Sequence, residues 1–145
     1  MKAMLEQLKT SSVHDHRELL QTRGEIEAAA CQGMSQFEQK HMGRRPQDVR
    51  AYLMGDLLVI RVQGTLTSAE QHLATTLPSE KGRELLKQIR SQLLETARPA
   101  LESLVQAITG AKIRSLHHDI STLTGEQIVV FTLATTPQVR ETRTK

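Results

Sequence analysis

The sequence is poor in aromatic side chains, with no tryptophan, one tyrosine and two phenylalanines. Proteins that hold single-stranded nucleic acids stack the bases on aromatic rings, so this platform is missing. The pI is about 9.3, but residues 23–134 carry 13 Lys or Arg against 12 Asp or Glu. Most of the excess positive charge lies in the tail after residue 134. No basic stripe is present, and no nucleic-acid partner is expected.

Cysteine and long apolar runs are also scarce. Cys31 is the only cysteine, which excludes an internal disulfide and any zinc site built on paired cysteines. The charged start of the chain does not fit a secretory signal. No stretch approaches the roughly 18 apolar residues of a membrane helix. We therefore expect a cytoplasmic protein in a reducing compartment, without direct membrane insertion.

The length of 145 residues is typical of one domain with a core of its own. We divide the chain into a poorly patterned N-terminal extension at 1–22, an α+β domain at 23–134 and a disordered basic tail at 135–145. The extension places Met1, Met4, Leu5 and Leu8 at helical spacing, which is short and nearly neutral for a membrane-binding helix and more typical of a frayed one.

Two patterns predict a helix followed by a hairpin. Apolar residues three and four apart predict a helix over 24–40 that ends before Gly43 and Pro46. Gly55-Asp56 then predicts a two-residue turn of type II′. That turn sets a register in which facing residues sum to 111, so the apolar residues of both strands share one face, while the other face is partly exposed.

Two helices should follow the first hairpin. Thr67 and Glu70 have the spacing of a capping box at the start of a short helix. Apolar residues from Leu85 to Ile108 predict a long helix over 79–109, kinked at Pro99 and stopped by Gly110. A helix with such a wide apolar face either crosses the whole sheet or reaches a second subunit.

The last unit is a second hairpin whose turn contains Gly125. Ile128 to Phe131 form a continuous apolar run, typical of a strand covered on both faces, and this favours an interface. The predicted order is α-β-β-α-α-β-β: a single α+β domain with a four-stranded, largely antiparallel sheet and helices on one face. Because one small chain would struggle to cover both apolar surfaces, we expect a homo-oligomer, most simply a dimer.

Three blocks of the sequence resemble the bacterial MpsC-like family, described as a Na-translocating system protein. They run from GEIEAAACQGMSQF to AEQHLA, from GRELLKQIR to TGAKI, and over SLHHDISTLTGEQIVVFTL. The resemblance covers about residues 24–134. It implies a soluble protein associated with a membrane system for cation or inorganic-carbon transport or membrane-potential generation, peripheral to the inner membrane through a partner. It brings with it no established enzymatic activity and no established cofactor.

The family's motifs fall on particular residues of this chain. Its H-x-D-[IV]-S-T-x-T-G-E pattern falls on His117, Asp119, Ile120, Ser121, Thr122, Thr124, Gly125 and Glu126. Its G-R-G-P element falls on Gly43, Arg44, Arg45 and Pro46, where Arg45 replaces the usual glycine. Its L-T-x-x-E element falls on Leu66, Thr67 and Glu70. These motifs supply the candidate residues for partner or anion contact.

Each chemical interpretation has a plainer alternative that we favour. The row His117, Asp119, Ser121 on one strand face could hold a metal or a proton, but a hydrogen-bonded polar face before a turn fits better. Arg44 and Arg45 could clamp an oxyanion, although a solvated loop is simpler. The cluster 14–16 of His, Asp and His indicates incidental polarity.

Catalysis is not expected, since Cys31 lies among alanines and no nucleophile elbow occurs. The leading prediction is an accessory or interaction protein, without catalytic, cofactor or metal residues. The alternatives are a small-anion or metal sensor and a dimeric DNA-binding regulator.

Overall fold

The computed structural model describes residues 20–76 and 79–141, and the first helix within these ranges begins at a capping box. Thr22 Oγ1 accepts the Glu25 amide, while Glu25 Oε1 accepts the Thr22 amide, both at 3.1 Å. Helix α2 (Arg23–Phe37) then continues as a π-helical turn, η1 (Glu38–Met42). Gly43, at φ 87°, ends it. The predicted stop before Gly43 is confirmed, but the π turn was not foreseen.

The first hairpin joins β1 (Asp48–Met54) to β2 (Leu57–Gln63). Its register pairs Leu53 with Leu58 and Ala51 with Ile60, which confirms the predicted sum of 111. Gly55 takes the positive φ of 61° that the first position of a type II′ turn requires. The shared apolar face is buried, while Tyr52 on the opposite face is exposed.

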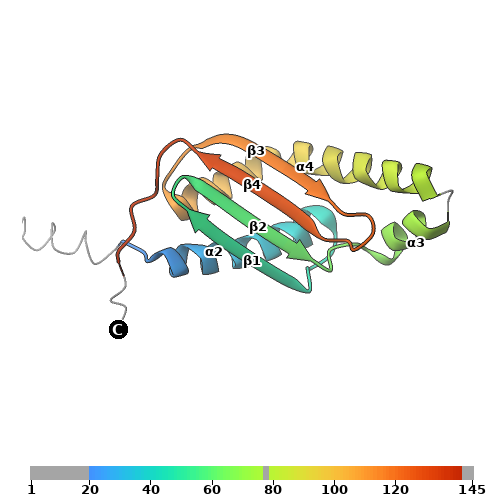
Figure 1. Ribbon diagram of the computed structural model, residues 1–145, viewed down its shortest axis with the longest axis horizontal. Helices are drawn as coiled ribbons and strands as arrows, with labels where there is room; N and C mark the ends of the chain where they lie inside the picture. Colours follow the sequence, from blue (N-terminus) through green and yellow to red (C-terminus); the bar gives the residue numbers. More distant parts are fainter. Residues whose placement is uncertain (1–19, 77–78, 142–145) are drawn as a thin grey trace, which may run out of the picture.

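The two middle helices also lie where the sequence predicts them. α3 (Ser68–Thr76) starts at a capping box in which Thr67 and Glu70 bond each other's backbone amides at 3.2 and 3.0 Å. α4 (Ser79–Thr109) passes through Pro99 without interruption. It crosses beneath the sheet and extends past it, where α3 packs against it (Figure 1).

The second hairpin, β3 (Ile113–Ile120) and β4 (Gln127–Leu133), completes one antiparallel sheet of order β1-β2-β4-β3. The predicted α+β fold is therefore confirmed. β4 lies between β2 and β3, and its burial alternates from residue to residue. In the single chain only one face of β4 is covered, because Val130 on the other face is half-buried. Among the described residues no helix covers the second face of β4, so a cover for it must come from a second subunit or another partner.

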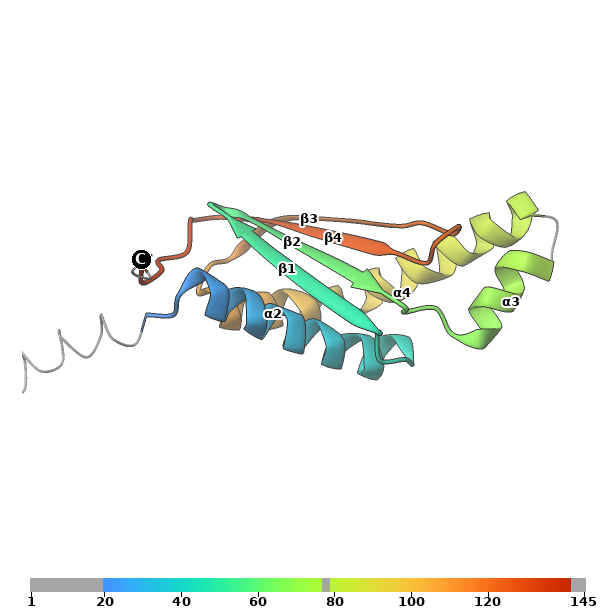
Figure 2. The same cartoon turned by 60° about the horizontal axis from the view of Figure 1, so that its bottom comes forward.

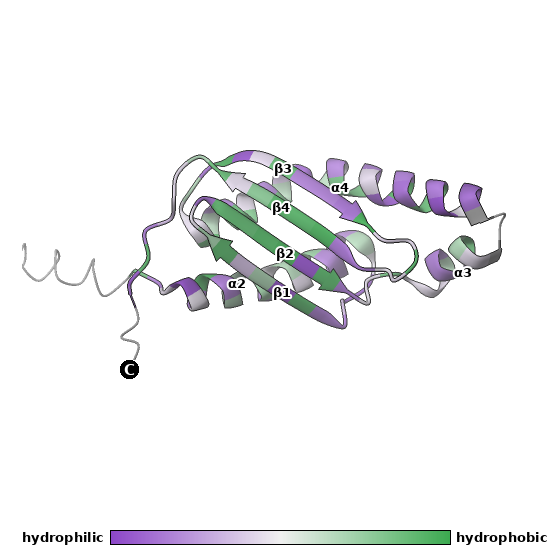
Figure 3. Cartoon of the chain, in the orientation of Figure 1, coloured by the Kyte–Doolittle hydropathy of each residue, from purple (hydrophilic) through white to green (hydrophobic). Residues whose placement is uncertain are grey.

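The three described α-helices lie on one side of the sheet (Figure 2). The main core forms between them and the strands, and the hydrophobic residues concentrate in the central strands β2 and β4 (Figure 3). A smaller apolar cluster of Leu66, Leu86 and Ile120, with Ala74 packed on it, lies where α3 meets α4. The far face of the sheet carries no helix among the described residues.

Residues 135–141 return to the start of α2. The Arg140 amide donates to the Gln21 carbonyl at 2.9 Å, and the Arg140 side chain approaches Glu25 at 3.4 Å. Residues 142–145 and the N-terminal cluster at 14–16 lie outside the described residues.

Candidate functional site

A buried polar centre joins elements that are far apart in the sequence. Arg90 of α4 is 3% exposed and Glu38 of η1 is fully buried. Arg90 Nη2 lies 3.3 Å from Glu38 Oε2 and donates at 2.8 Å to both Thr65 Oγ1 and Gln127 Oε1. Thr65 in turn donates to Glu38 at 2.7 Å. The centre therefore ties α4 to η1, to β4 and to the segment after β2.

The charge of Arg90 is compensated inside the fold. Glu70 of α3 places Oε2 3.6 Å from Arg90 Nη1 and adds a second carboxylate. Burial raises the pKa of Glu38, and this effect exceeds the lowering by the Arg90 charge and by the Thr65 hydrogen bond. Glu38 Oε1, Arg90 Nε and Arg90 Nη1 have no hydrogen-bond partner among the described residues. These three atoms are closed off from solvent, although Arg90 and Gln127 also line a hollow of about 190 Å³ beside β3.

Sequence reasoning missed this centre. The sequence does contain a signal for it, because a charged residue stands at a position where the helical spacing otherwise places apolar residues. Glu38 follows Ala30 and Met34 at intervals of four, and Arg90 stands between Leu86 and Leu94 at the same interval. A charge at such a position points inward and must find a partner. The sequence does not say which partner, because 52 positions separate Glu38 from Arg90.

The family motif builds the turn between β3 and β4. Ser121 Oγ accepts the Thr124 amide and Thr124 Oγ1 accepts the Glu126 amide, both at 3.2 Å. Gly125 has a φ of 77° and lies close to Leu66. Glu126 is anchored by Arg61 Nε at 2.7 Å. Most of this motif therefore shapes and fastens a turn.

His117 and Asp119, also in the motif, are both exposed on β3. Asp119 Oδ1 accepts from Lys87 Nζ of α4 at 3.3 Å. The Ile120 amide, and after it Lys87, lower the pKa of Asp119. The neighbouring His118 points the other way, and its Nε2 lies 3.7 Å from Glu95 Oε1. The expected shared face of His117 and Asp119 thus forms the outer side of the sheet at the β3 edge.

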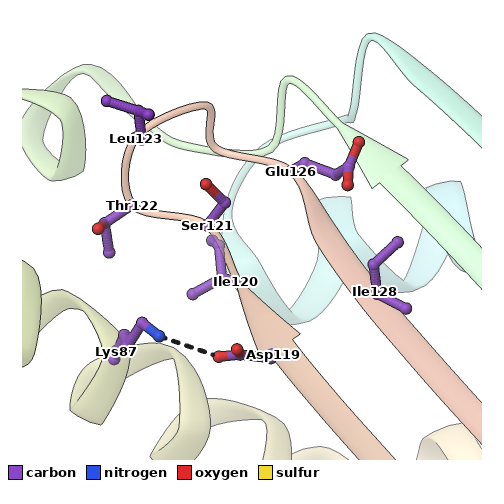
Figure 4. A pocket seen from close by; sticks show the side chains of 8 residues that line it. All are labelled: Lys87, Asp119, Ile120, Ser121, Thr122, Leu123, Glu126 and Ile128. Atoms are coloured by element: carbon purple, nitrogen blue, oxygen red, sulfur yellow. Dashed lines mark hydrogen bonds and ion pairs between the residues drawn. The ribbon is translucent and has the colours of Figure 1, made fainter.

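A hollow of about 370 Å³ lies beside this turn, bounded by Lys87, Asp119, Thr122, Leu123 and Glu126 among others (Figure 4). Leu123 is 88% exposed. A second hollow of about 190 Å³ shares Lys87 and Asp119 and reaches Ser91 and His118. Both hollows lie where α4 runs beneath β3.

The arginine loop after η1 is engaged with the chain itself. Arg44 Nη1 donates to the Leu66 carbonyl at 2.7 Å, and Arg45 Nε donates to Ser35 Oγ at 3.3 Å. Pro46 is buried between them and β1. The two guanidinium groups therefore diverge to separate partners, and nothing here favours an anion clamp.

The surface also carries an apolar stripe on α4. Leu85, Ile89 and Leu93, at intervals of four, are each 39–40% exposed. The stripe ends at a hollow of about 420 Å³ bounded by His41, Ala97 and Pro99 among others. An exposed row of large aliphatic side chains is typical of a contact surface.

Within 20–76 and 79–141, no three histidine, cysteine or carboxylate side chains come together as a metal site would require. The thiol of Cys31 is packed against β1; burial raises its pKa, and a backbone contact from Ala51 only partly opposes this. No helix in this part of the chain combines the length and apolar character needed to cross a bilayer.

The comparisons with known proteins agree with the motifs. The model of a family described as "Na+-translocating membrane potential-generating system (MpsC)" matches residues 22–135. A protein of Bacillus subtilis (strain 168), "Uncharacterized protein YbcI", is 33% identical over 112 residues, which cover 77% of this chain and 88% of that protein. No solved structure matches the chain.

Proposed function

This chain belongs to the MpsC family, and we propose that it is a non-catalytic interaction protein, a homo-oligomer that serves as an accessory to a membrane system generating a membrane potential by Na⁺ translocation. The family description supports the connection to such a system. The exposed stripe of Leu85, Ile89 and Leu93 carries the interaction role. Three aliphatic side chains along about two and a half helical turns lose water-exposed apolar area on contact with a partner.

A binding role also fits the chemistry of the described residues. Polar side chains at the family motifs are used in turns and caps, and the buried arginine is compensated by two carboxylates. These arrangements favour a rigid scaffold over a reactive site. A rigid scaffold presents its surface without a large ordering cost, which favours binding.

The test is the membrane potential of the native cell. We expect deletion of the gene to lower the Na⁺-dependent potential measured with a voltage-sensitive dye, and the wild-type gene to restore it. Ile89→Glu, which places a charge in the stripe, should restore the potential poorly. Gln88→Glu, a neighbouring exposed change of equal charge, should restore it fully.

A deletion strain with an unchanged Na⁺-dependent potential would refute the accessory role. Equal rescue by Ile89→Glu and Gln88→Glu would show that the stripe is not the contact surface. Circular dichroism of both purified variants is the control for folding.

A further inference from the structure

One edge of the sheet is open and lies above a charged helix face. β3 ends the strand order, and among the described residues only β4 pairs with it. Beneath this edge, α4 presents Lys87, Ser91 and Glu95 at intervals of four. Lys87 contacts Asp119 and Glu95 contacts His118, so this helix row runs alongside β3.

The charges of this helix face are self-complementary about Ser91. Counting from Ser91, Glu84 and Arg98 lie seven residues away on either side, and Lys87 and Glu95 lie four away. At 100° per residue all five fall within an arc of about 80°. A two-fold axis at Ser91, which sets two α4 helices antiparallel, brings each Lys87 to Glu95 of the second copy and each Glu84 to Arg98 of the second copy.

The same two-fold axis also pairs residues of two β3 strands. Ser91 and His118 bound one hollow, so they lie close together. In an antiparallel pair, directly opposite residues point to the same face. Centring two β3 strands on His118 therefore sets His117 opposite Asp119 of the second copy on the outer face. Both sets of pairs follow from one axis, and forming the helix pairs requires Lys87 and Arg98 to leave their partners in the same chain, Asp119 and Glu102.

We propose that the β3 edge, with the α4 face beneath it, is the homodimer interface of this protein, and that two antiparallel β3 strands join both sheets into one continuous sheet. The proposal rests on the homo-oligomer of the proposed function and names its surface. An unpaired edge supplies main-chain hydrogen bonds, and the charge pattern supplies direction and register. The contact is isologous, as a closed dimer requires. The stripe of Leu85, Ile89 and Leu93 lies on a different side of α4 and stays available to another partner.

The test uses two charge reversals of the full chain, measured by light scattering after size exclusion and by sedimentation equilibrium. Wild type should be a dimer. Lys87→Glu and Glu95→Lys should each be mainly monomeric, because every dimer of either variant holds two like-charge contacts. An equimolar mixture should recover dimers containing one copy of each, since both contacts then join opposite charges. Recovery should weaken at high salt.

Arg50→Glu reverses a charge on the opposite edge strand and should leave the dimer intact. Melting curves of all variants report the fold separately. A wild-type monomer at every concentration would overturn both this interface and the homo-oligomer of the proposed function. A wild-type dimer that survives both reversals, or variants that do not recover on mixing, would overturn this interface alone. Neither result bears on the membrane-potential test, so the accessory role is tested separately from this interface.

Discussion

The two edge strands of the sheet, β1 and β3, differ in the contacts that helices make to their outer sides. At β1, side chains of α2 close the outer row: Glu27 Oε2 accepts the Leu53 amide at 2.8 Å, and the sulfur of Cys31 meets the Ala51 amide. At β3, the contacts from the neighbouring helix are side-chain pairs, Lys87 with Asp119 and Glu95 with His118, and neither pair engages a main-chain amide. Natural sheets protect edges that must not associate. The difference supports the proposed pairing at β3, where an irregularity between Ile113 and Ser115 limits that pairing to the later part of the strand.

The largest expected effect is on stability and concerns Arg90, the α4 residue of the buried polar centre. Arg90→Met removes one partner of a buried ion pair and should lower the free energy of unfolding by about 3–5 kcal/mol, because Glu38 is left buried without its cation. Urea denaturation measures it. The exposed Arg50→Met is the control and should change little.

Combining Arg90→Met with Glu38→Leu should recover much of this loss, since both charges are then gone. A double variant that loses stability additively would contradict the role of the pair.

The protection of the β1 edge is tested by Glu27→Ala. Removal of the carboxylate frees the Leu53 amide, which should lower the free energy of unfolding by about 1–2 kcal/mol and add concentration-dependent association in light scattering. Glu27→Gln retains an acceptor oxygen and should associate less. If Glu27→Ala behaves as wild type in both measurements, β1 is not protected by this contact.

The pH dependence of stability isolates Glu38. Its pKa is raised in the fold, so the folded state binds the proton more tightly than the unfolded state. The resulting stabilisation is full below the unfolded pKa, about 4.3, and is lost as the pH rises through the folded pKa. Relative to Glu38→Gln, wild type should therefore lose stability as the pH rises above about 4.3.

The measurement is urea denaturation at a series of pH values, with the exposed Glu141→Gln as control. Parallel curves for wild type and Glu38→Gln would mean that the pKa of Glu38 is not raised.

The smallest effect on folding should come from Lys87→Ala. The pair with Asp119 is exposed and should contribute less than about 1 kcal/mol to a single copy. The same change should nevertheless weaken dimerisation by removing both contacts to Glu95 of the second copy. A large drop in monomer stability, measured on a dilute sample, would place Lys87 in the fold and not in the interface.

Local signals predicted most of the fold. The Gly55-Asp56 turn fixed the register of the first hairpin, and the Thr67–Glu70 spacing located the start of α3, because turns and caps act over four or five residues. Strand alternation predicted that His117 and Asp119 share one face of β3, but it did not predict that this face is exposed. The π turn was not predictable, since a continued apolar period looks the same in either helix type.

The buried centre and the unequal edges escaped prediction for a different reason. Both depend on which elements become neighbours, and the contact of Arg90 with Gln127 spans 37 positions. For His117 and Asp119 the sequence favoured a hydrogen-bonded polar face over a metal or proton site, and their outward position on an edge strand supports the proposed pairing with a second copy. The symmetric charges around Ser91 could not be interpreted from the sequence, because only the structure shows that Ser91 lies beside β3.

The most direct test of the unequal edges is hydrogen–deuterium exchange at two protein concentrations. The account predicts that amides of residues 113–120 exchange more slowly in the concentrated sample, while amides of residues 48–54 exchange at the same rate in both. Equal exchange of 113–120 at both concentrations, in a sample shown to change from monomer to dimer, would contradict it.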